Sequence, residues 1–164
     1  MTWPAYVVLA VVTLQRLGEL LLAERNARRL LARGAHEVGR GHYPFLVAVH
    51  AGWLIVLWLL GPGPPINIVP LIAYLVLQVA RIWVIATLGD RWTTRIIVLP
   101  GEPLVRRGPY RWFDHPNYLI VIAEIAVLPL VFGLPVVAAF FSVLNAIVLW
   151  VRVREENEAL APHR

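Results

Sequence analysis

The chain has 164 residues, of which 59% are hydrophobic and 15% are charged, whereas a typical soluble chain carries about 25% charged residues. A soluble domain of this length would expose large apolar patches, so the composition excludes a soluble fold, and it excludes intrinsic disorder as well. All fifteen basic residues are arginine, the net charge is +5, and the absence of cysteine excludes a disulfide scaffold and a thiol nucleophile.

The first apolar segment covers residues 3–22. It is long enough to cross a bilayer, because roughly 20 helical residues span about 30 Å of hydrocarbon. The segment lacks the basic start and the cleavage site of a signal peptide, and it contains Arg16 and Glu19. We therefore predict a retained transmembrane helix.

A stretch without any charged residue follows from Gly41 to Ala80. It is interrupted by Gly61-Pro62-Gly63-Pro64-Pro65, which cannot continue a helix. We predict two spans here, residues 42–60 and 66–88, joined by a short uncharged turn.

Residues 117–151 contain a single charged residue, Glu124, and are divided by Gly133-Leu134-Pro135. This pattern predicts a tight helical hairpin of two spans, residues 117–132 and 135–151, followed by a polar tail. The predicted fold is an all-α integral membrane protein with five transmembrane helices, which form a single membrane-embedded domain over residues 1–164.

The arginines indicate the orientation, because basic residues gather on the cytoplasmic side of a membrane. Five lie in residues 23–41, five lie in residues 89–116, and the tail carries Arg152, Arg154 and Arg164. The turns at 61–65 and 133–135 contain none. We expect a multi-pass protein of the cell membrane, in a bacterium the inner membrane, with its N-terminus outside and its C-terminus in the cytoplasm.

A layer of polar residues lies inside the predicted spans. Each is five to eight residues from the cytoplasmic end of its span, which is roughly 8–12 Å at 1.5 Å per residue. The members are Arg16, His50, Arg81, Glu124 and Asn145. Such groups are costly in a membrane and face the interior of a bundle. Two interpretations are open: satisfied ion pairs such as Arg16–Glu19 and Arg81–Glu124, or the floor of a substrate cavity.

The last basic loop ends in Arg106-Arg107-Gly108-Pro109-Tyr110-Arg111-Trp112-Phe113-Asp114-His115-Pro116-Asn117-Tyr118. Gly108-Pro109 predicts a turn, and Pro116 suits the first position of a helix. In the tail, one helical face carries Arg152, Glu155, Glu156 and Leu160. These residues can bind a polar ligand with hydroxyls and an ammonium group, but their types alone favour snorkelling arginines, an aromatic belt and a solvated helix end.

The combination of Gly-Pro-Tyr, His-Pro-Asn-Tyr before a helical hairpin, and Arg-x-x-Glu-Glu-x-x-x-Leu after it resembles the isoprenylcysteine carboxyl methyltransferase family. Residues 15–19, 24–26, 33–37 and 41–44 are similar to its short bacterial branch, which includes O-methyltransferases that act on alkylpyrones. The resemblance covers nearly the whole chain. It departs from the family at Asp114, where a basic residue is common, and at Leu119 and Ile120, where a small residue is usual.

The resemblance implies S-adenosylmethionine as methyl donor. It places Tyr110, His115, Pro116 and Tyr118 along the cofactor site, with Glu155 and Glu156 holding polar groups of the cofactor. Arg152 would approach the substrate anion or the methionine carboxylate. Arg152 and Arg111 are the expected catalytic residues, since a guanidinium group matches a carboxylate and can orient the acceptor anion. The polar layer of Arg16, His50, Arg81, Glu124 and Asn145 would line the substrate cavity.

We expect an S-adenosylmethionine-dependent O-methyltransferase that acts at the cytosolic membrane face. Its acceptor would be a lipophilic carboxylate or enol, such as an alkylpyrone-like polyketide or a prenylated carboxylate, which needs no strong general base because it is already ionised. Membrane lipids are the other expected partners, with no nucleic acid and no metal. Two alternatives are an NADPH-dependent membrane reductase of the sterol-reductase type and a non-enzymatic membrane subunit.

Overall fold

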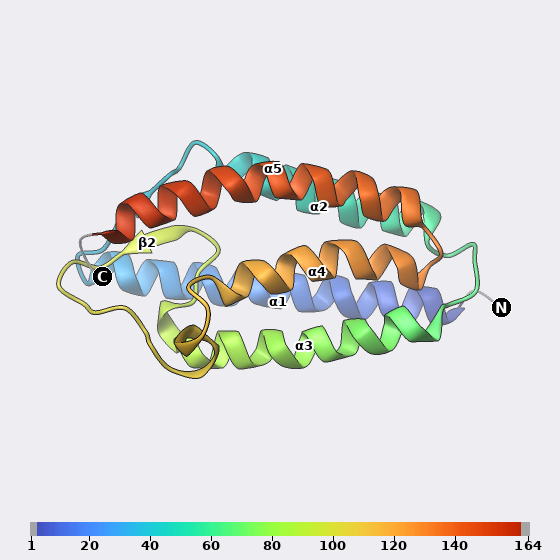
Figure 1. Cartoon of the computed structure of the whole chain (residues 1–164), viewed down its shortest axis with the longest axis horizontal. Coiled ribbons are helices and arrows are strands. Elements are labelled where there is room, and N and C mark those ends of the chain that lie inside the picture. The colour runs from blue at the N-terminus through green and yellow to red at the C-terminus, as the bar shows by residue number, and fades with distance from the viewer. Residues whose placement is uncertain (1–2, 162–164) are drawn as a thin grey trace.

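The computed structural model describes residues 3–161, so Arg164 lies outside the described residues. Five long helices run side by side in alternating directions (Figure 1). They are α1 (Trp3–Ala32), α2 (Tyr43–Leu60), α3 (Ile68–Leu88), α4 (Pro116–Val131) and α5 (Pro135–Leu160). Two short 3-10 helices, η1 (Gly89–Arg91) and η2 (Gly108–Arg111), lie in the long loop before α4.

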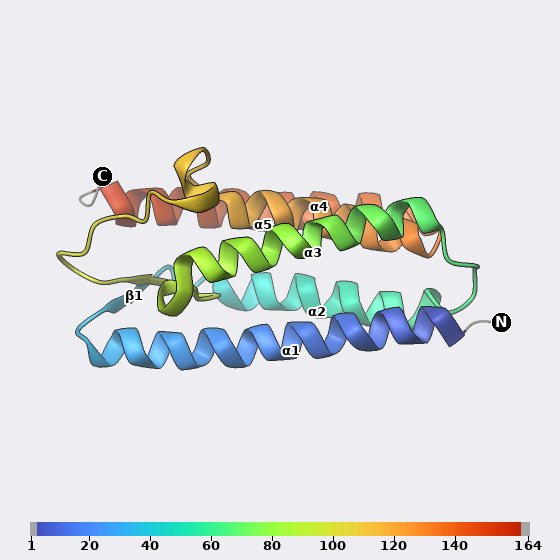
Figure 2. The same ribbon diagram turned by 90° about the horizontal axis from the view of Figure 1, so that it is seen from below.

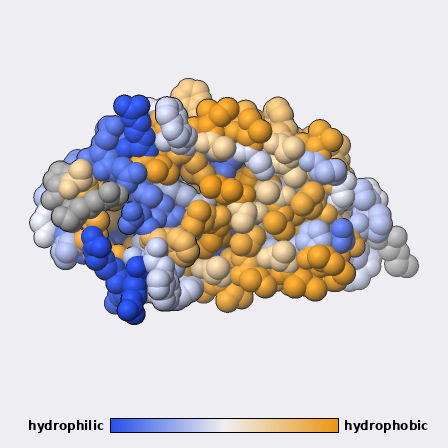
Figure 3. Space-filling view, viewed as in Figure 1, coloured by the Kyte–Doolittle hydropathy of each residue, from blue (hydrophilic) through white to orange (hydrophobic). Residues whose placement is uncertain are grey.

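Four of these helices are long and apolar enough to cross a membrane: α1, α2, α3 with η1, and α5. Helix α4 is apolar but has 16 residues, or about 24 Å at 1.5 Å per residue. Large apolar side chains are exposed on all of them, as Leu21 (74%), Leu59 (74%) and Val136 (80%) illustrate. Figure 3 shows this apolar surface as a broad band between polar ends. An all-α membrane protein is thus confirmed, while the count of five spans stays a prediction.

Two helices are longer than the spans predicted from hydropathy. Helix α1 continues from residue 22 to Ala32, and α5 continues from residue 151 to Leu160. Both extensions are rich in Ala, Leu, Glu and Arg, which favour helix. Each also has an ion pair at i, i+4, Glu24–Arg28 at 2.9 Å and Arg154–Glu158 at 3.1 Å. Hydropathy marks where the apolar segment ends and does not mark where the helix ends.

The basic segments meet at one end of the bundle, and the turns at 61–65 and 133–135 lie at the other (Figures 1 and 2). At the basic end, β1 (His36–Val38) pairs antiparallel with β2 (Ile96–Val98), with His36 opposite Val98. This sheet could not be predicted from the sequence, because each strand has only three residues and the two strands are distant from each other in the chain.

The hydrophobic core fills the half of the bundle nearest the turns. Its members come from the adjoining ends of all five helices: Ala5, Leu9, Val12, Trp53, Leu57, Tyr74, Ile125, Leu128, Val131, Phe132 and Phe141. At the basic end α1 is held by a polar contact, since the buried Asn26 amide donates to the carbonyls of Gly89 (3.1 Å) and Trp92 (2.9 Å). Because this core fills the half of the bundle near the turns, the cavities of the bundle lie toward the basic end.

Candidate functional site

A cavity of about 400 Å³, here called the loop cavity, lies at the basic end of the bundle. One wall is the segment from Arg91 to Arg106, which includes β2. The other walls are the start of α4 and one face of α5. Small-molecule and cofactor sites have volumes of roughly 300–1,000 Å³, so this cavity is large enough for one such molecule.

The loop cavity brings together most of the residues that the sequence predicted for a cofactor site. Tyr110, His115, Tyr118, Glu156 and Arg152 all line it, although they come from η2, α4 and α5. Glycine is required at Gly108, at the start of η2, because its φ is +55° and an added Cβ would lie 2.6 Å from Thr87 Oγ1. This close approach docks the Gly-Pro-Tyr turn on α3 and turns Tyr110 toward the cavity.

A hydrogen-bonded chain joins the α4 and α5 walls. Arg152 Nε donates to Tyr118 Oη at 2.7 Å, and Tyr118 Oη donates to the Glu156 carboxylate. The His115 ring stacks on Tyr118 with centroids 5.3 Å apart, and its Nε2 lies 3.1 Å from Asn157 Oδ1. Tyr118 and Arg152 are thereby held in one orientation.

Three of the predicted residues have other surroundings. Pro116 is buried as the first residue of α4 and lines neither cavity. Glu155 does not line the loop cavity and lies 3.0 Å from His42 Nδ1, because it is turned by about 100° from Glu156, which lines the cavity together with Arg152. Arg111 is exposed and lines neither cavity.

A second cavity of about 320 Å³, here called the bundle cavity, lies deeper among the helices. Its lining is mostly apolar and comes from all five long helices and from residues 92–94 of the loop that follows η1. Leu17 and Leu20 on α1 and Val47 and Ala51 on α2 line it and are also exposed on the apolar outer surface. The cavity therefore opens sideways between α1 and α2.

The two cavities share one wall. It consists of Trp92, Thr93, Asn117, Tyr118 and Arg152, which line both. Within residues 3–161, three buried polar atoms of this wall have no hydrogen-bond partner: Arg152 Nη1, Asn117 Oδ1 and Trp92 Nε1. Buried polar atoms without a partner cost free energy. Such atoms between a cavity of mixed polar and apolar lining and a mostly apolar one are suited to bind the polar groups of a ligand.

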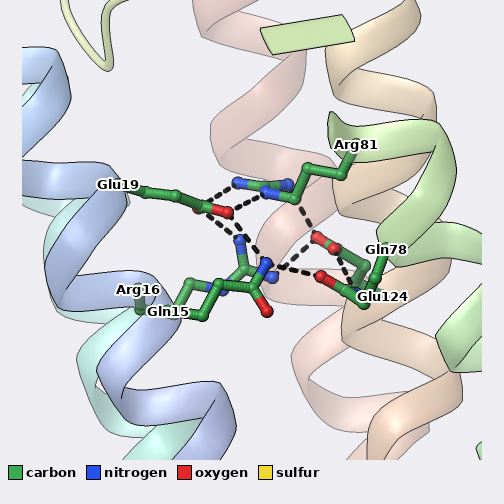
Figure 4. Close-up of polar contacts among 6 residues, drawn as sticks. All are labelled: Gln15, Arg16, Glu19, Gln78, Arg81 and Glu124. Carbon is green, nitrogen blue, oxygen red and sulfur yellow. Dashed lines mark hydrogen bonds and ion pairs between the residues drawn. The ribbon is translucent and has the colours of Figure 1, made fainter. Parts of the chain in front are cut away.

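Three residues of the polar layer, Arg16, Arg81 and Glu124, form an ion-pair network with Glu19 that joins α1, α3 and α4 (Figure 4). Arg16 contacts Glu19 at 2.9 Å and Glu124 at 2.8 Å, and Arg81 contacts the same two carboxylates at 2.7 and 2.8 Å. Gln15 and Gln78 add hydrogen bonds to these carboxylates. The predicted pairs Arg16–Glu19 and Arg81–Glu124 are thus confirmed.

The network also forms part of the bundle cavity, so the two interpretations of the polar layer are compatible. Arg16, Arg81 and His50 line the cavity. Glu124 and Asn145 do not line it, and both are 1% exposed. Glu124 accepts from both arginines, which turns its carboxylate into the network.

Tyr110 lies outside the membrane-spanning helices and has a perturbed acidity. Burial raises the pKa of its hydroxyl well above the usual value of 10, and the negative charge of Glu156 raises it further. The hydroxyl therefore stays protonated at neutral pH and remains a hydrogen-bond donor in the loop cavity.

The sequence analysis missed Trp92, Thr93 and Asn117 as wall residues. Asn117 stands within the His-Pro-Asn-Tyr motif, so its position beside Tyr118 was an available signal. Trp92 and Thr93 follow η1 in a loop without any recognisable pattern, and only the packing of that loop brings them to the wall.

Comparison with known proteins gives a family profile and two curated relatives. The profile described as "Isoprenylcysteine carboxyl methyltransferase (ICMT) family" matches residues 69–162. "Uncharacterized protein YpbQ" of Bacillus subtilis (strain 168) is 38% identical over 168 residues, with 94% of this chain and 95% of the relative covered. An "Uncharacterized protein" of Haemophilus influenzae is 23% identical over 161 residues, with 94% of each covered. No solved structure matches the chain.

Proposed function

Because the chain belongs to the isoprenylcysteine carboxyl methyltransferase family, we propose that it is an S-adenosylmethionine-dependent O-methyltransferase for a lipophilic carboxylate or enol. The observation that carries the proposal is the wall of Tyr118 and Arg152 between a cavity of mixed polar and apolar lining and a mostly apolar one. Methyl transfer requires direct contact between the donor methyl group and the acceptor oxygen, so a donor in the loop cavity and an acceptor in the bundle cavity would meet at this boundary.

The loop cavity has the side chains that the donor requires. When bound, S-adenosylmethionine supplies an electrophilic methyl group on a positively charged sulfur. Tyr110 and Phe113 offer aromatic surface for its base, and Glu156 offers a carboxylate for its ammonium or hydroxyl groups. Among the loop-segment arginines of this cavity, Arg91 and Arg95 are paired with carboxylates, so Arg106 is the one available to the carboxylate of the donor. The unpartnered Asn117 Oδ1 in the shared wall adds a neutral acceptor.

Arg152 binds the acceptor anion in this proposal. Its Nε is already held by Tyr118, and its Nη1 has no partner within the described chain, so the guanidinium group is oriented with the two N–H donors of Nη1 free. A carboxylate or acidic enol is ionised near neutral pH, so the site needs to orient the oxygen and exclude water but needs no strong base. Burial of Arg152 (4% exposed) supports the exclusion of water.

We further propose that the acceptor enters from the lipid and that the loop cavity faces the cytosol. The opening between α1 and α2 is rimmed by apolar side chains, and the basic segments lie at the loop-cavity end. This orientation has five spans, with α4 crossing beside α5, the N-terminus outside and the C-terminus inside. Alkaline phosphatase should be active when inserted in the turn at 61–65 and inactive when fused after residue 164; the reverse pattern would contradict the orientation.

The activity is tested with purified protein, labelled S-adenosylmethionine and a panel of lipophilic carboxylates and enols. Wild type should bind the donor and transfer label to at least one lipophilic acceptor. Arg152→Lys keeps the charge but loses the guanidinium fork, so we expect kcat/KM to fall by about 100-fold. Arg154→Lys on the same helix is the control, since Arg154 is exposed and lines neither cavity, and it should retain wild-type transfer.

Failure of the folded protein to bind the donor would refute the proposal. If the protein instead consumed NADPH when a lipid extract was added, the reductase interpretation would replace the methyltransferase proposal. Tyr118→Phe separates the two roles of this side chain, because it removes the hydroxyl that joins Arg152 to Glu156 and keeps the ring that stacks on His115. We expect weaker transfer with a folded protein.

A further inference from the structure

Two polar side chains of α2 line the bundle cavity away from the shared wall. They are His50 and Trp53, which are three residues apart and therefore neighbours on one helical face. Seven residues separate His50 from Tyr43 at the start of α2, or about 10 Å along the helix. Their surroundings in the cavity include the apolar side chains of Leu17, Leu46 and Leu54.

His50 offers a hydrogen-bond acceptor to this cavity. Its Nδ1 lies 2.8 Å from the carbonyl oxygen of Leu46. A carbonyl oxygen only accepts, so Nδ1 carries the proton and donates, and in the neutral ring Nε2 keeps a lone pair. No hydrogen bond or ion pair to His50 Nε2 exists among residues 3–161. The backbone contact thus fixes the tautomer that leaves an acceptor available.

Trp53 offers a donor beside it. The side chain is 2% exposed, and within the described residues its Nε1 is buried without a hydrogen-bond partner. An indole N–H can only donate, and a buried donor without a partner carries a desolvation penalty. Most buried tryptophan N–H groups find a partner, and this one, on a residue that lines the cavity, lacks one among the described residues.

We propose that His50 and Trp53 form a second subsite that binds a hydroxyl group of the acceptor, about 10 Å along α2 from Tyr43 at the start of that helix. The inference rests on the proposed function for the identity of the occupant. A hydroxyl group can donate to His50 Nε2 and accept from Trp53 Nε1 at once, whereas a carbonyl oxygen can only accept and an ammonium group can only donate. The acceptor is therefore a lipophilic carboxylate or enol with a hydroxyl within its apolar part.

The position of these groups supports a ligand more than a structural role. Polar groups within a membrane span are costly and mark functional sites when they face a cavity. The ion-pair network beside them satisfies its own carboxylates, so it does not need His50 or Trp53. A site that hydrogen-bonds a substrate hydroxyl also rejects the analogue that lacks it, because its polar groups are then left unpaired.

The test compares fatty acids that carry a hydroxyl group at successive positions with the unsubstituted acid of equal length. Displacement of a fluorescent fatty acid from the purified full-length protein measures binding, and transfer of label from S-adenosylmethionine measures turnover. We expect wild type to prefer a mid-chain hydroxyl by on the order of tenfold, the value of one or two buried hydrogen bonds. His50→Phe and Trp53→Phe each keep an aromatic ring but remove its polar nitrogen, so they should lose this preference while still binding the unsubstituted acid.

Val47→Ala is the matched control, because it changes an apolar residue of the same cavity and should affect both acids equally. A wild type without preference for any hydroxyl position, or a preference that survives in both phenylalanine variants, would overturn the subsite. If the preference appears in displacement but no acid is methylated, the subsite stands and the proposed methyl transfer fails for these acceptors.

Discussion

Replacement of Glu124 by glutamine tests whether the ion-pair network stabilises the bundle. Glu124 is 1% exposed, and its carboxylate lies 2.8 Å from both Arg16 Nη2 and Arg81 Nη1 and accepts from Gln78 at 2.8 Å. The network consists of two arginines and two glutamates, so it is neutral. In Glu124→Gln the shape is kept, but one positive charge is left buried without a counter-charge.

The expected loss of stability in Glu124→Gln is large because the Glu124 carboxylate is buried. Removing one partner of a buried pair costs about 3–5 kcal/mol, since the remaining charge is desolvated without compensation. For a chain of this size, each kcal/mol lowers the melting temperature by about 2–4 °C, so we expect a decrease of roughly 6–20 °C. Glu158→Gln is the control: it removes an exposed i, i+4 partner of Arg154, worth about 0.3–0.5 kcal/mol.

Thermal unfolding of the detergent-purified variants, followed by circular dichroism, measures the difference. The charge-balanced double variant Glu124→Gln with Arg16→Gln should recover part of the loss, because it restores neutrality. If Glu124→Gln melts within about 2 °C of wild type, as the control is expected to do, the network contributes no stability and the reasoning is wrong.

Three further predictions concern the loops at the basic end. Gly108→Ala should destabilise by about 1–3 kcal/mol more than Gly101→Ala, because both have positive φ but only the first would bring a Cβ to 2.6 Å from Thr87; equal melting temperatures would contradict this. The raised pKa of Tyr110 stabilises the fold below the usual value of 10, and this stability is lost as pH rises through the raised value. Tyr110→Phe should therefore lose stability less steeply than wild type above about pH 10. Asn26→Leu removes two hydrogen bonds to loop carbonyls and should lower the free energy of unfolding by about 1–3 kcal/mol, seen as a lower melting temperature than that of the wild type; an unchanged melting temperature would contradict this.

Much of the fold could be predicted because hydropathy and helix-breaking Gly and Pro residues act locally. The charge-free stretch and its Gly-Pro interruption predict α2 and α3 to within two residues at each end. The helix ends at Ala32 and Leu160 could not be predicted in this way, because they depend on propensity and i, i+4 pairs beyond the membrane. The sheet depends on strands that meet only after the helices have packed.

The site was predictable where residues share a motif and unpredictable where loops meet helices. Tyr110, His115 and Tyr118 are close in sequence, and all three line the loop cavity. The different surroundings of Glu155 and Glu156 could not be predicted from the sequence. Glu156 faces the cavity and Glu155 faces His42 because neighbouring elements fix the rotation of α5 about its axis.

By itself, the sequence determined that the chain is a membrane protein, where its helices lie along the chain, and at which end of the bundle the arginines gather. These properties follow from local composition and the cost of burying charge. Only the tertiary structure decided that two cavities share a wall at Tyr118 and Arg152 and that the ion-pair network of the polar layer is also part of a cavity. These properties depend on which helix faces approach one another across the bundle, and that is set by packing along the whole chain rather than by any one segment.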